Sequence, residues 1–296
     1  MAIELHCHSL FSVDGRGTPE DLVDAAADRG ITALALTDHN SLGGVSRARA
    51  QADRRGIRFL SGVELDAYWN DRSYHFLAIG FDPEDAALTE LADRNFSVYG
   101  HSFGLYLEQF PAIGHPDLQA VLREALPDRY PTHPGPVLNQ WFARDVLLEQ
   151  GLLADGEAYT GLIREARSRV VEQRGADVFR RFTDLDEALS VVHGAGGILV
   201  LAHVANYLQG DAEAQLALVR DGIRFGLDGF ELYHPINRAE PHFDRLATLA
   251  EEVGCATTGG SDCHDASQTD KNPIGCADVP DSLLDRIDEA LDARRR

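Results

Sequence analysis

Short apolar runs alternate with longer segments of helical period along most of the chain. Each run is rich in Val, Ile, Leu and Ala, as expected of buried strands, whereas the longer segments repeat their apolar residues with a helical spacing. The alternation predicts βα units and a mostly parallel sheet or barrel. Seven strands are expected, at Ile3–His6, Ala33–Thr37, Arg58–Val63, Tyr74–Ile79, Gly197–Ala202, Gly229–Tyr233 and Cys255–Gly259. This number with intervening helices favours a closed or distorted barrel over an open sheet.

The expected helices lie between these runs, and one of them has a well-marked start. Thr18 has the character of an N-cap, Pro19 suits the first helical position, and Glu20 and Asp21 place acids in the first turn. Gly30 then ends this helix. Further helices are expected at Leu42–Arg55, Leu185–His193, Ala212–Phe225, Glu240–Val253 and Leu283–Arg294.

One long segment interrupts the alternation between the fourth and fifth expected strands. It contains Pro- and Gly-rich loops and amphipathic helices such as Gly156–Arg169. We therefore expect a barrel domain from residues 1–87 and 182–296, and an inserted helical cap subdomain from residues 88–181. Insertions in barrels usually lie over the mouth, where this one could select the substrate.

The charge of the chain restricts its partners. Asp and Glu number 48 against 27 Lys and Arg, which gives a formal net charge of −21. A protein this acidic does not hold long nucleic acid or an anionic membrane through its overall field. A phosphorylated substrate must therefore be held by local positive charge, from a few basic residues or from bound metal.

The sequence also bears on location. The first residues lack the basic and apolar regions of a signal peptide, and no stretch approaches the roughly 20 apolar residues of a membrane span. The four cysteines show no CxxC pairing. We expect a cytoplasmic protein without a membrane partner, and the oligomeric state is left open.

Acidic residues and histidines gather where the expected strands end. The carboxyl ends of parallel strands form the functional face of α/β folds, and side chains two residues apart on a strand share a face. Singly, each of these residues has a structural interpretation, such as a turn residue for Asp14 or a hydrogen-bonded core histidine for His75 and His203. Together they favour a metal site. The set comprises His6, His8, Asp14, His39, Glu64, His75, His203, Asp262 and His264.

Five segments carry a resemblance to a known family. HCHSLFSVDG, ALTDHNSLGG, GVE, LAHV and GSDCH, in this order, resemble the motifs of the PHP (polymerase and histidinol phosphatase) family of metal-dependent phosphoesterases. The resemblance covers about residues 3–80 and 185–280. It implies an α/β fold, a distorted (β/α)7 barrel with an inserted helical subdomain, and up to three metal ions at the carboxyl ends of the strands.

The resemblance also implies a role for each motif residue. One ion would take His6, His8, Glu64 and Asp262; a second would share the catalytic Glu64 as a bridge, with His75 and His203; a third would take Asp14, His39 and His264. Mixed imidazole and carboxylate sites accommodate Zn, Mn or Fe, so we expect two or three divalent transition metal ions. Such ions can activate a shared hydroxide for in-line attack on a phosphate ester.

Four further residues are candidates for contact with the substrate. Arg16 and Lys271 lie near metal motifs in the sequence, and Arg238 follows the sixth strand, so each could bind phosphate. The alternative for each is a solvated surface cation. His234 directly follows the sixth strand, and we count it as a candidate catalytic group for proton transfer or for support of a ligand.

These residues lead to a phosphoesterase that hydrolyses a small phosphorylated metabolite, such as a nucleoside bisphosphate or a short oligonucleotide. A cyclic-phosphate phosphodiesterase of the same fold is the nearest alternative. A metal-dependent amidohydrolase is a third, but many of these bridge two metals with a carboxylated lysine from a middle strand, and the only lysine, Lys271, follows the last motif. A non-catalytic PHP module is a fourth, and the complete ligand set weighs against it.

Overall fold

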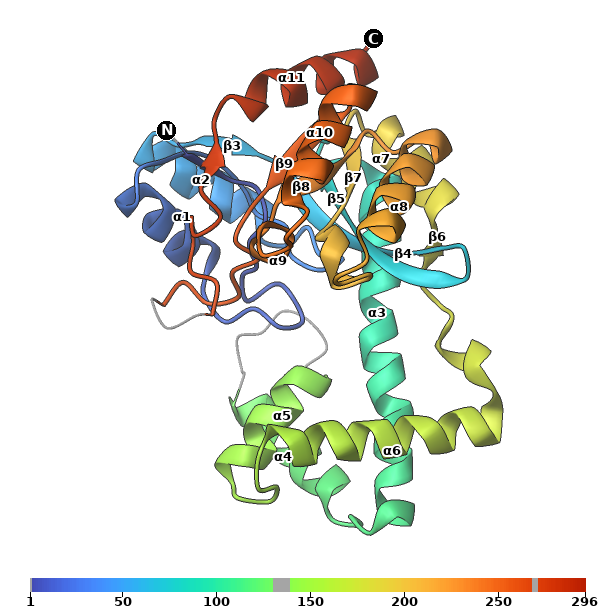
Figure 1. Cartoon of the computed structure of the whole chain (residues 1–296). Helices are drawn as coiled ribbons and strands as arrows, with labels where there is room; N and C mark the ends of the chain where they lie inside the picture. The colour runs from blue at the N-terminus through green and yellow to red at the C-terminus, as the bar shows by residue number, and fades with distance from the viewer. Residues whose placement is uncertain (1, 130–138, 268–270) are drawn as a thin grey trace. The chain divides into compact units, whose positions relative to one another are not determined.

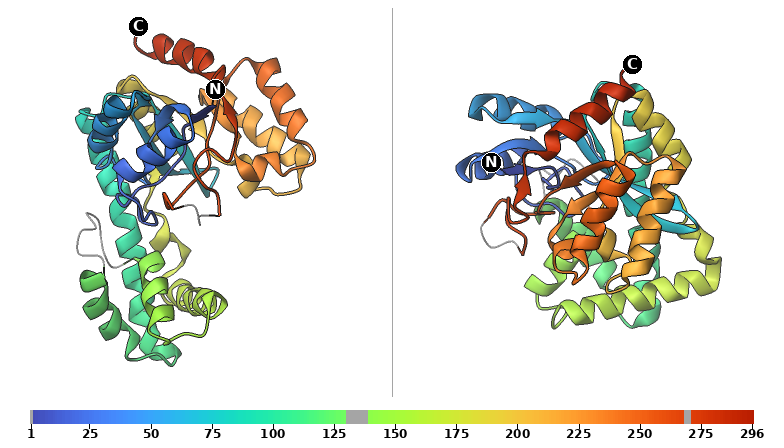
Figure 2. Two further views of the ribbon diagram at one scale, coloured as in Figure 1. Left: turned by 90° about the vertical axis from the view of Figure 1, so that its left-hand side faces the viewer. Right: turned by 45° about the horizontal axis from the view of Figure 1, so that its top comes forward.

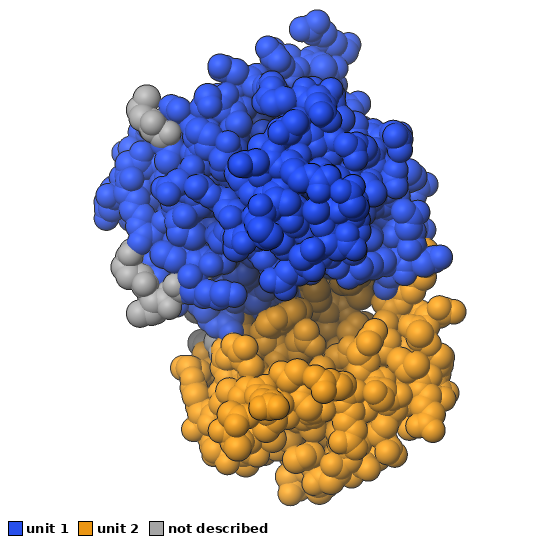
Figure 3. Space-filling view, viewed as in Figure 1, with its two compact units in different colours: residues 1–93, 183–296 blue, residues 94–182 orange. Residues whose placement is uncertain are grey.

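The protein is described by a computed structural model that covers residues 2–129, 139–267 and 271–296 (Figure 1). The chain forms two compact units (Figure 3). Unit 1 comprises Met1–Asp93 and Thr183–Arg296, and unit 2 comprises Arg94–Phe182. Helix α3 (Ala86–Gln109) begins in unit 1 and continues into unit 2.

Unit 1 contains two sheets. The four-stranded sheet has the order β10 (Val279–Pro280), β1 (Ala2–Glu4), β2 (Ile31–Ala35) and β3 (Arg58–Leu60). The six-stranded sheet has the order β6 (Thr183–Asp184), β4 (Gly62–Trp69), β5 (Arg72–Ile79), β7 (Ile198–Leu201), β8 (Gly229–Tyr233) and β9 (Ala256–Gly259). With its helices, this arrangement confirms the predicted α/β class.

Hydrogen bonds link the two sheets at both sides. Leu5 N donates to Gly259 O at 3.0 Å, which joins the end of β1 to the end of β9. Asn40 N donates to Glu64 O at 2.8 Å, which joins the loop after β2 to β4. The loops that follow β1, β2 and β9 are thereby held close to β4. Closure into the (β/α)7 ring stays a prediction.

The expectation of one strand over Arg58–Val63 is wrong. The chain leaves the first sheet after β3, and Gly62 begins a different strand that pairs antiparallel with β5 along its whole length. A Cβ atom at Gly62 would lie 2.5 Å from Leu36 O, so the crossing needs glycine. Asn70 and Asp71, both with positive φ (49° and 61°), form the tight turn between β4 and β5. β5 also pairs antiparallel with β7, so the six-stranded sheet is mixed.

The helices of unit 1 lie outside the strands (Figure 2). The predicted start of α1 (Pro19–Asp28) is confirmed, because the Thr18 side chain accepts from Asp21 N and the Asp21 side chain accepts from Thr18 N. α1 packs on α2 (Val45–Arg55), α7 (Leu185–Gly194) packs on β4 and β7, and α8 (Ala212–Phe225) and α10 (Phe243–Val253) pack on β8.

The remaining helices of unit 1 follow the later strands. α11 (Leu283–Arg294) packs on β9 and β7. The short helix α9 (Pro235–Arg238) and the 3₁₀ turn η3 (Val204–Asn206) follow β8 and β7. Buried Val, Ile, Leu and Ala side chains fill the space between the strands and these helices.

Unit 2 is helical. Besides the second part of α3 it contains η1 (Phe110–Ile113), α4 (Leu118–Arg129), α5 (Gln140–Glu149), α6 (Gly156–Arg174) and η2 (Ala176–Phe179). Its core includes Phe103, Phe110 and Phe142, all at most 1% exposed. The role in substrate selection expected of this insertion stays a prediction. Among the described residues of the whole chain, no helix has both the length and the apolar character to cross a membrane.

Candidate metal centre

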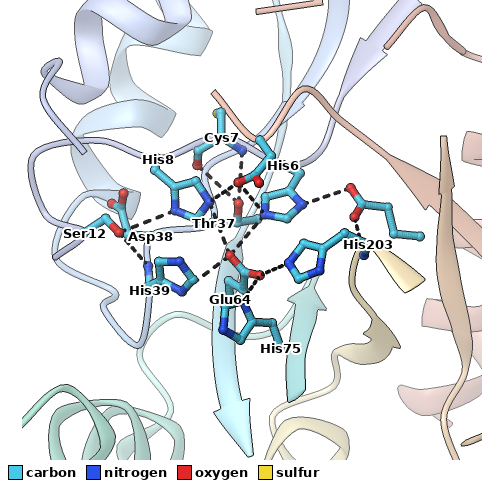
Figure 4. A network of polar contacts seen from close by, with 12 residues as sticks. His6, Cys7, His8, Ser12, Thr37, Asp38, His39, Glu64, His75 and His203 are labelled. Atoms are coloured by element: carbon cyan, nitrogen blue, oxygen red, sulfur yellow. Dashed lines mark hydrogen bonds and ion pairs between the residues drawn. The ribbon is translucent and has the colours of Figure 1, made fainter. Parts of the chain in front are cut away.

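The carboxylate of Glu64 lies at the middle of a buried group of imidazoles (Figure 4). Both of its oxygens contact histidine nitrogens. Oε1 lies 2.9 Å from His75 Nδ1 and 3.0 Å from His203 Nε2. Oε2 lies 3.1 Å from His6 Nε2, 3.3 Å from His8 Nε2 and 3.4 Å from His39 Nδ1. A carboxylate with donor atoms on both oxygens has the geometry of a bridging ligand.

Two more carboxylates extend this group. Asp262 Oδ1 lies 3.0 Å from His8 Nε2 and 3.3 Å from His6 Nε2. Asp14 Oδ2 lies 3.1 Å from His264 Nε2 and 3.7 Å from His39 Nε2. The structure thus brings all nine predicted metal ligands together. Two four-residue sets have ligand atoms within 4.8 Å of one another: His6, His8, Glu64 and Asp262, and His8, Asp14, His39 and His264. A third group joins Glu64 and His75 of the expected second set to His39, and His203 is not part of that group.

Most of these side chains follow a strand, as expected, but two do not. His6 and His8 follow β1, and His39 follows β2. Glu64 and His75 lie inside β4 and β5, where Asp66 pairs with His75, so the expectation that Glu64 ends a strand is wrong. The antiparallel pairing of β4 and β5 brings these two side chains within hydrogen-bonding distance of each other.

Local backbone geometry at the centre is unusual for non-glycine residues. His203 has φ +27° and Asp262 has φ +57°, both in the left-handed region. Such conformations persist only where surrounding contacts hold them, and they concentrate at functional sites. The chain before Asp262 passes close to His6 at Gly260, where a Cβ would lie 2.4 Å from His6 N.

Several imidazoles present one nitrogen to the central carboxylates and the other to an outer partner. His6 Nδ1 lies 2.9 Å from Glu231 Oε1, and His75 Nε2 lies 3.3 Å from Asp66 Oδ1. His264 Nδ1 lies 2.8 Å from the carbonyl oxygen of Asp262. Metal-binding histidines are held in this way, with the outer nitrogen protonated and the inner one available to the ion. The donor set therefore fits metal ions.

The outer partners Glu231 and Asp66 were not predicted from the sequence. Glu231 is the one acidic residue in the otherwise apolar strand β8, GFELY, and Asp66 lies two residues after Glu64 in β4, GVELDAYW. A buried acidic residue in a mostly apolar strand is uncommon unless it is paired. That signal is readable in the sequence, but the partner is not.

The carboxylates and imidazoles of the centre shift one another's pKa values, each favouring the charged form of the other. Burial lowers the pKa of His6, but Glu231, Glu64 and Asp262 outweigh it and raise that pKa well above its ordinary value. Burial likewise opposes the shift at His8, whose pKa the carboxylates of Asp262 and Glu64 raise to about 10. Burial raises the pKa of Glu64, yet the surrounding histidines lower it well below its ordinary value. The carboxylate is thus held ionised, the form in which it binds metal.

A cavity of about 390 Å³ adjoins this group of ligands. Lys271 lines it together with His203, His234 and Asp262, and the rest of the wall comes from Asn206, Gln209, Pro235, Ile236, Ala239 and Asn272. The structure therefore places the predicted substrate contact Lys271 on the same cavity as two predicted metal ligands.

The two predicted arginine contacts hold backbone carbonyls. Arg16 Nη1 donates to Asp14 O at 2.6 Å, within its own loop. Arg238 Nη1 donates to Ala277 O. Both side chains stabilise loops that follow strands of the centre, and their contact with a substrate stays a prediction.

His234 is buried at the start of α9. Its Nδ1 accepts a hydrogen bond from Ile236 N at 3.1 Å, which leaves the ring proton on Nε2 when the imidazole is neutral. Nε2 lies 3.4 Å from Asp262 Oδ2. His234 therefore contacts a predicted metal ligand and lines the cavity.

Known proteins match most of the chain. A family model described as PHP domain matches residues 4–120. The phosphoribosyl 1,2-cyclic phosphate 1,2-diphosphodiesterase of Eggerthella lenta is 30% identical over 272 residues, which cover 89% of this chain and 94% of that protein. The chain belongs to the PHP family. The resemblance found in the sequence is thereby confirmed.

Two further proteins match this PHP chain over nearly its whole length. The 3′,5′-nucleoside bisphosphate phosphatase of Chromobacterium violaceum is 29% identical over 295 residues, 96% of this chain and 97% of that protein. A solved structure from the same organism, named an amidohydrolase with bound sulfate and no metal, superposes with a TM-score of 0.73 at 26% identity. That match covers 99% of this chain and 97% of the other.

Proposed function

We propose that this PHP-family protein is a metal-dependent phosphoesterase that hydrolyses a small phosphorylated metabolite. The observation that carries the proposal is the buried Glu64 carboxylate, which has imidazole nitrogens on both oxygens. The cavity of His203, Asp262 and Lys271 beside it provides room for a substrate. The names of two long matches, a bisphosphate phosphatase and a cyclic-phosphate phosphodiesterase, support the same reaction class.

The proposed cofactor is a set of two or three divalent transition metal ions. Imidazole and carboxylate donors suit Zn, Mn or Fe. His6, His8, Glu64 and Asp262 would hold one ion; Glu64, His75 and His203 a second; Asp14, His39 and His264 a third. Bound ions would lower the pKa of a water molecule and neutralise charge on the phosphoryl oxygens.

The chain's own residues then bind and orient the ester. Glu64 joins two ligand groups, so it fixes their separation. Lys271 places an ammonium group on the cavity wall, where it attracts a phosphoryl group to a protein whose net charge of −21 repels it. The Nε2–H of His234, a residue that lines the same cavity, points toward Asp262 Oδ2 at 3.4 Å and would orient that ligand.

The substrate proposed for the first assay is a nucleoside 3′,5′-bisphosphate, because the matching phosphatase spans 96% of this chain. A cyclic phosphodiester is the second candidate, because the diphosphodiesterase is 30% identical to this chain. One of the structurally similar proteins is named an amidohydrolase, which is the reason to test the amidohydrolase alternative. In this chain, however, the bridging position holds Glu64, and the only lysine lies on the loop Lys271–Asn272.

The test is a hydrolysis assay, with the products separated by chromatography, on purified protein loaded separately with Zn²⁺, Mn²⁺ or Fe²⁺. The panel contains a nucleoside 3′,5′-bisphosphate, a nucleoside 3′-monophosphate, a ribose cyclic phosphate and an N-acyl amino acid as the amidohydrolase probe. His6→Ala should lose metal and activity together. His193→Ala is the matched control, since His193 also bonds a carboxylate, that of Asp228, but outside the centre. Turnover that persists unchanged after chelation would refute the proposal, as would a metal-loaded protein that hydrolyses only the amide.

A further inference from the structure

Glu231 is a buried carboxylate whose two oxygens hold two different predicted metal ligands. It lies at the centre of β8 and is 0% exposed. Oε1 lies 2.9 Å from His6 Nδ1, and Oε2 accepts a hydrogen bond from the backbone N of His203 at 2.7 Å. A buried carboxylate is costly unless such bonds compensate it. Its two acceptors are therefore committed to these two histidines.

The contact with His6 determines which ring nitrogen carries the proton. An ionised carboxylate only accepts hydrogen bonds, so the bond to Oε1 places the proton of a neutral His6 on Nδ1. The lone pair of Nε2 then faces Glu64 Oε2 at 3.1 Å and Asp262 Oδ1 at 3.3 Å. Because the bond to Glu231 keeps a proton on Nδ1, Nε2 is the nitrogen that gives up its proton when an ion binds.

The contact with His203 acts on the backbone. His203 has φ +27°, a conformation that non-glycine residues rarely adopt. The hydrogen bond from its backbone N to Glu231 Oε2 helps to hold that conformation, and the ring Nε2 lies 3.0 Å from Glu64 Oε1. His6 and His203 belong to different proposed ligand groups, which meet at Glu64.

We infer that Glu231 is a positioning residue that couples two metal-binding groups, by fixing the tautomer of His6 and the backbone of His203 with one carboxylate. The inference rests on the proposed metal site. It predicts that a change at Glu231 weakens binding in both groups, although Glu231 is not one of the nine predicted metal ligands.

Glu231→Gln tests this coupling with little change in side-chain size. The glutamine amide has one oxygen, so it cannot accept from both His6 Nδ1 and His203 N. If the amide NH₂ faces His6, the ring proton moves to Nε2 and blocks the ion; if it faces His203, the backbone contact is lost. With Co²⁺ as the probe, we expect the dissociation constant to rise about 10- to 100-fold. The cobalt absorption spectrum should change as well.

Asp228→Asn is the matched control. Asp228 Oδ2 also contacts a histidine ring and a backbone N–H, those of His193 and Leu199, each at 2.8 Å, but it lies outside the centre. Asp228→Asn should lower the thermal stability and leave the Co²⁺ affinity and spectrum as in the wild type. Equal loss of Co²⁺ affinity in both variants would overturn the inference, because it would indicate general destabilisation.

The remaining outcomes separate this inference from the proposed function. A wild-type protein that binds no Co²⁺, Zn²⁺ or Mn²⁺ would refute both. A wild type that binds Co²⁺, with Glu231→Gln unchanged within about twofold, would overturn the role of Glu231 alone. If Glu231→Gln does not fold, ¹⁵N spectra of the Zn²⁺-loaded wild type decide. A proton on His6 Nδ1 supports the inference, and a proton on Nε2 refutes it.

Discussion

The two units of the protein bury different kinds of side chains. Among the described residues of unit 2, the buried polar side chains are the amides Asn95, Gln109 and Asn139, around a core of phenylalanine and leucine. Asn139 caps α5 by accepting from Phe142 N at 2.9 Å. Unit 1 has apolar cores too, but it also buries ionisable groups: Glu4, His6, His8, Asp38, His39, Glu64, Asp66, His203, Glu231, His234 and Glu240.

This difference indicates that the interior of unit 2 serves stability, whereas part of the interior of unit 1 serves function. An apolar interior contributes folding free energy directly, whereas buried charges must be matched by partners to be tolerated. Most of the buried charges of unit 1 converge on one small region, where carboxylates and imidazoles alternate. We therefore expect mutations in unit 1's centre to abolish metal binding, and mutations in unit 2's core to affect folding.

The largest expected effect is that of Glu64→Gln. Because Glu64 contacts five imidazoles, its loss should release metal from two groups and lower kcat/KM by more than about 100-fold, beyond the effect of changing an outer partner. Metal analysis and kinetics measure it. Glu240→Gln is the control, since Glu240 is buried but bonds Gly210 N and Gln215. Full metal content in Glu64→Gln would contradict the expectation that the buried charges of unit 1 hold the metal.

Phe142→Ala probes the other side of the comparison. Phe142 is 1% exposed in the core of unit 2, so the cavity should cost about 3–5 kcal/mol of unfolding free energy. Denaturant unfolding measures this, and the metal content should stay at the wild-type level. Leu152→Ala, at a side chain that is 41% exposed, should have little effect on either quantity. If Phe142→Ala lost metal in proportion to its loss of unfolding free energy, metal binding would depend on the core of unit 2 as well as on unit 1.

A smaller effect is expected for Lys271→Met, which keeps the ligands but removes a charge from the cavity. It should keep its metal and lower kcat/KM roughly 10- to 1000-fold, about 1.4–4 kcal/mol of transition-state binding. Arg224→Met is a control at an exposed cation paired with Asp221. Kinetics within about twofold of the wild type would indicate a surface lysine instead.

The smallest expected effect is that of Thr18→Ala, a polar change in unit 1 away from the centre. Loss of the capping box of α1 should lower the unfolding free energy by about 0.5–2 kcal/mol, with unchanged metal content. Thr160→Ala is the matched control, because Thr160 lies within α6 and its hydroxyl donates to Gly156 O in the preceding turn. A loss of metal in Thr18→Ala would mean that the surface of unit 1 also controls the centre.

Local features of the sequence predicted much of this centre. His6 and His8 stand two residues apart after an apolar run and fall in one ligand group, whereas Asp262 and His264, with the same spacing, fall in two different groups. The cap at Thr18 is equally local. Each of these predictions depended on a few adjacent residues.

Non-local pairing accounts for what the sequence did not predict. The apolar sequence that starts at Arg58 extends through β3 into β4 without a visible break. The pairing of β4 with β5 shows that the chain reverses direction at Asn70 and Asp71. The contact between His6 and Glu231 joins residues that are 225 positions apart. Hydrophobic periodicity indicates which face of a strand is buried, but neither its direction nor its neighbour.

The presence of one lysine in the whole sequence, on the wall of the cavity, makes the site chemically addressable. A reagent that acylates side-chain amines should modify Lys271 alone among the side chains. Its modification rate then becomes a reporter of occupancy, because a bound phosphate ester would shield the amine. A fluorophore attached there would allow ligands to be screened by emission alone, before any turnover assay has identified a substrate.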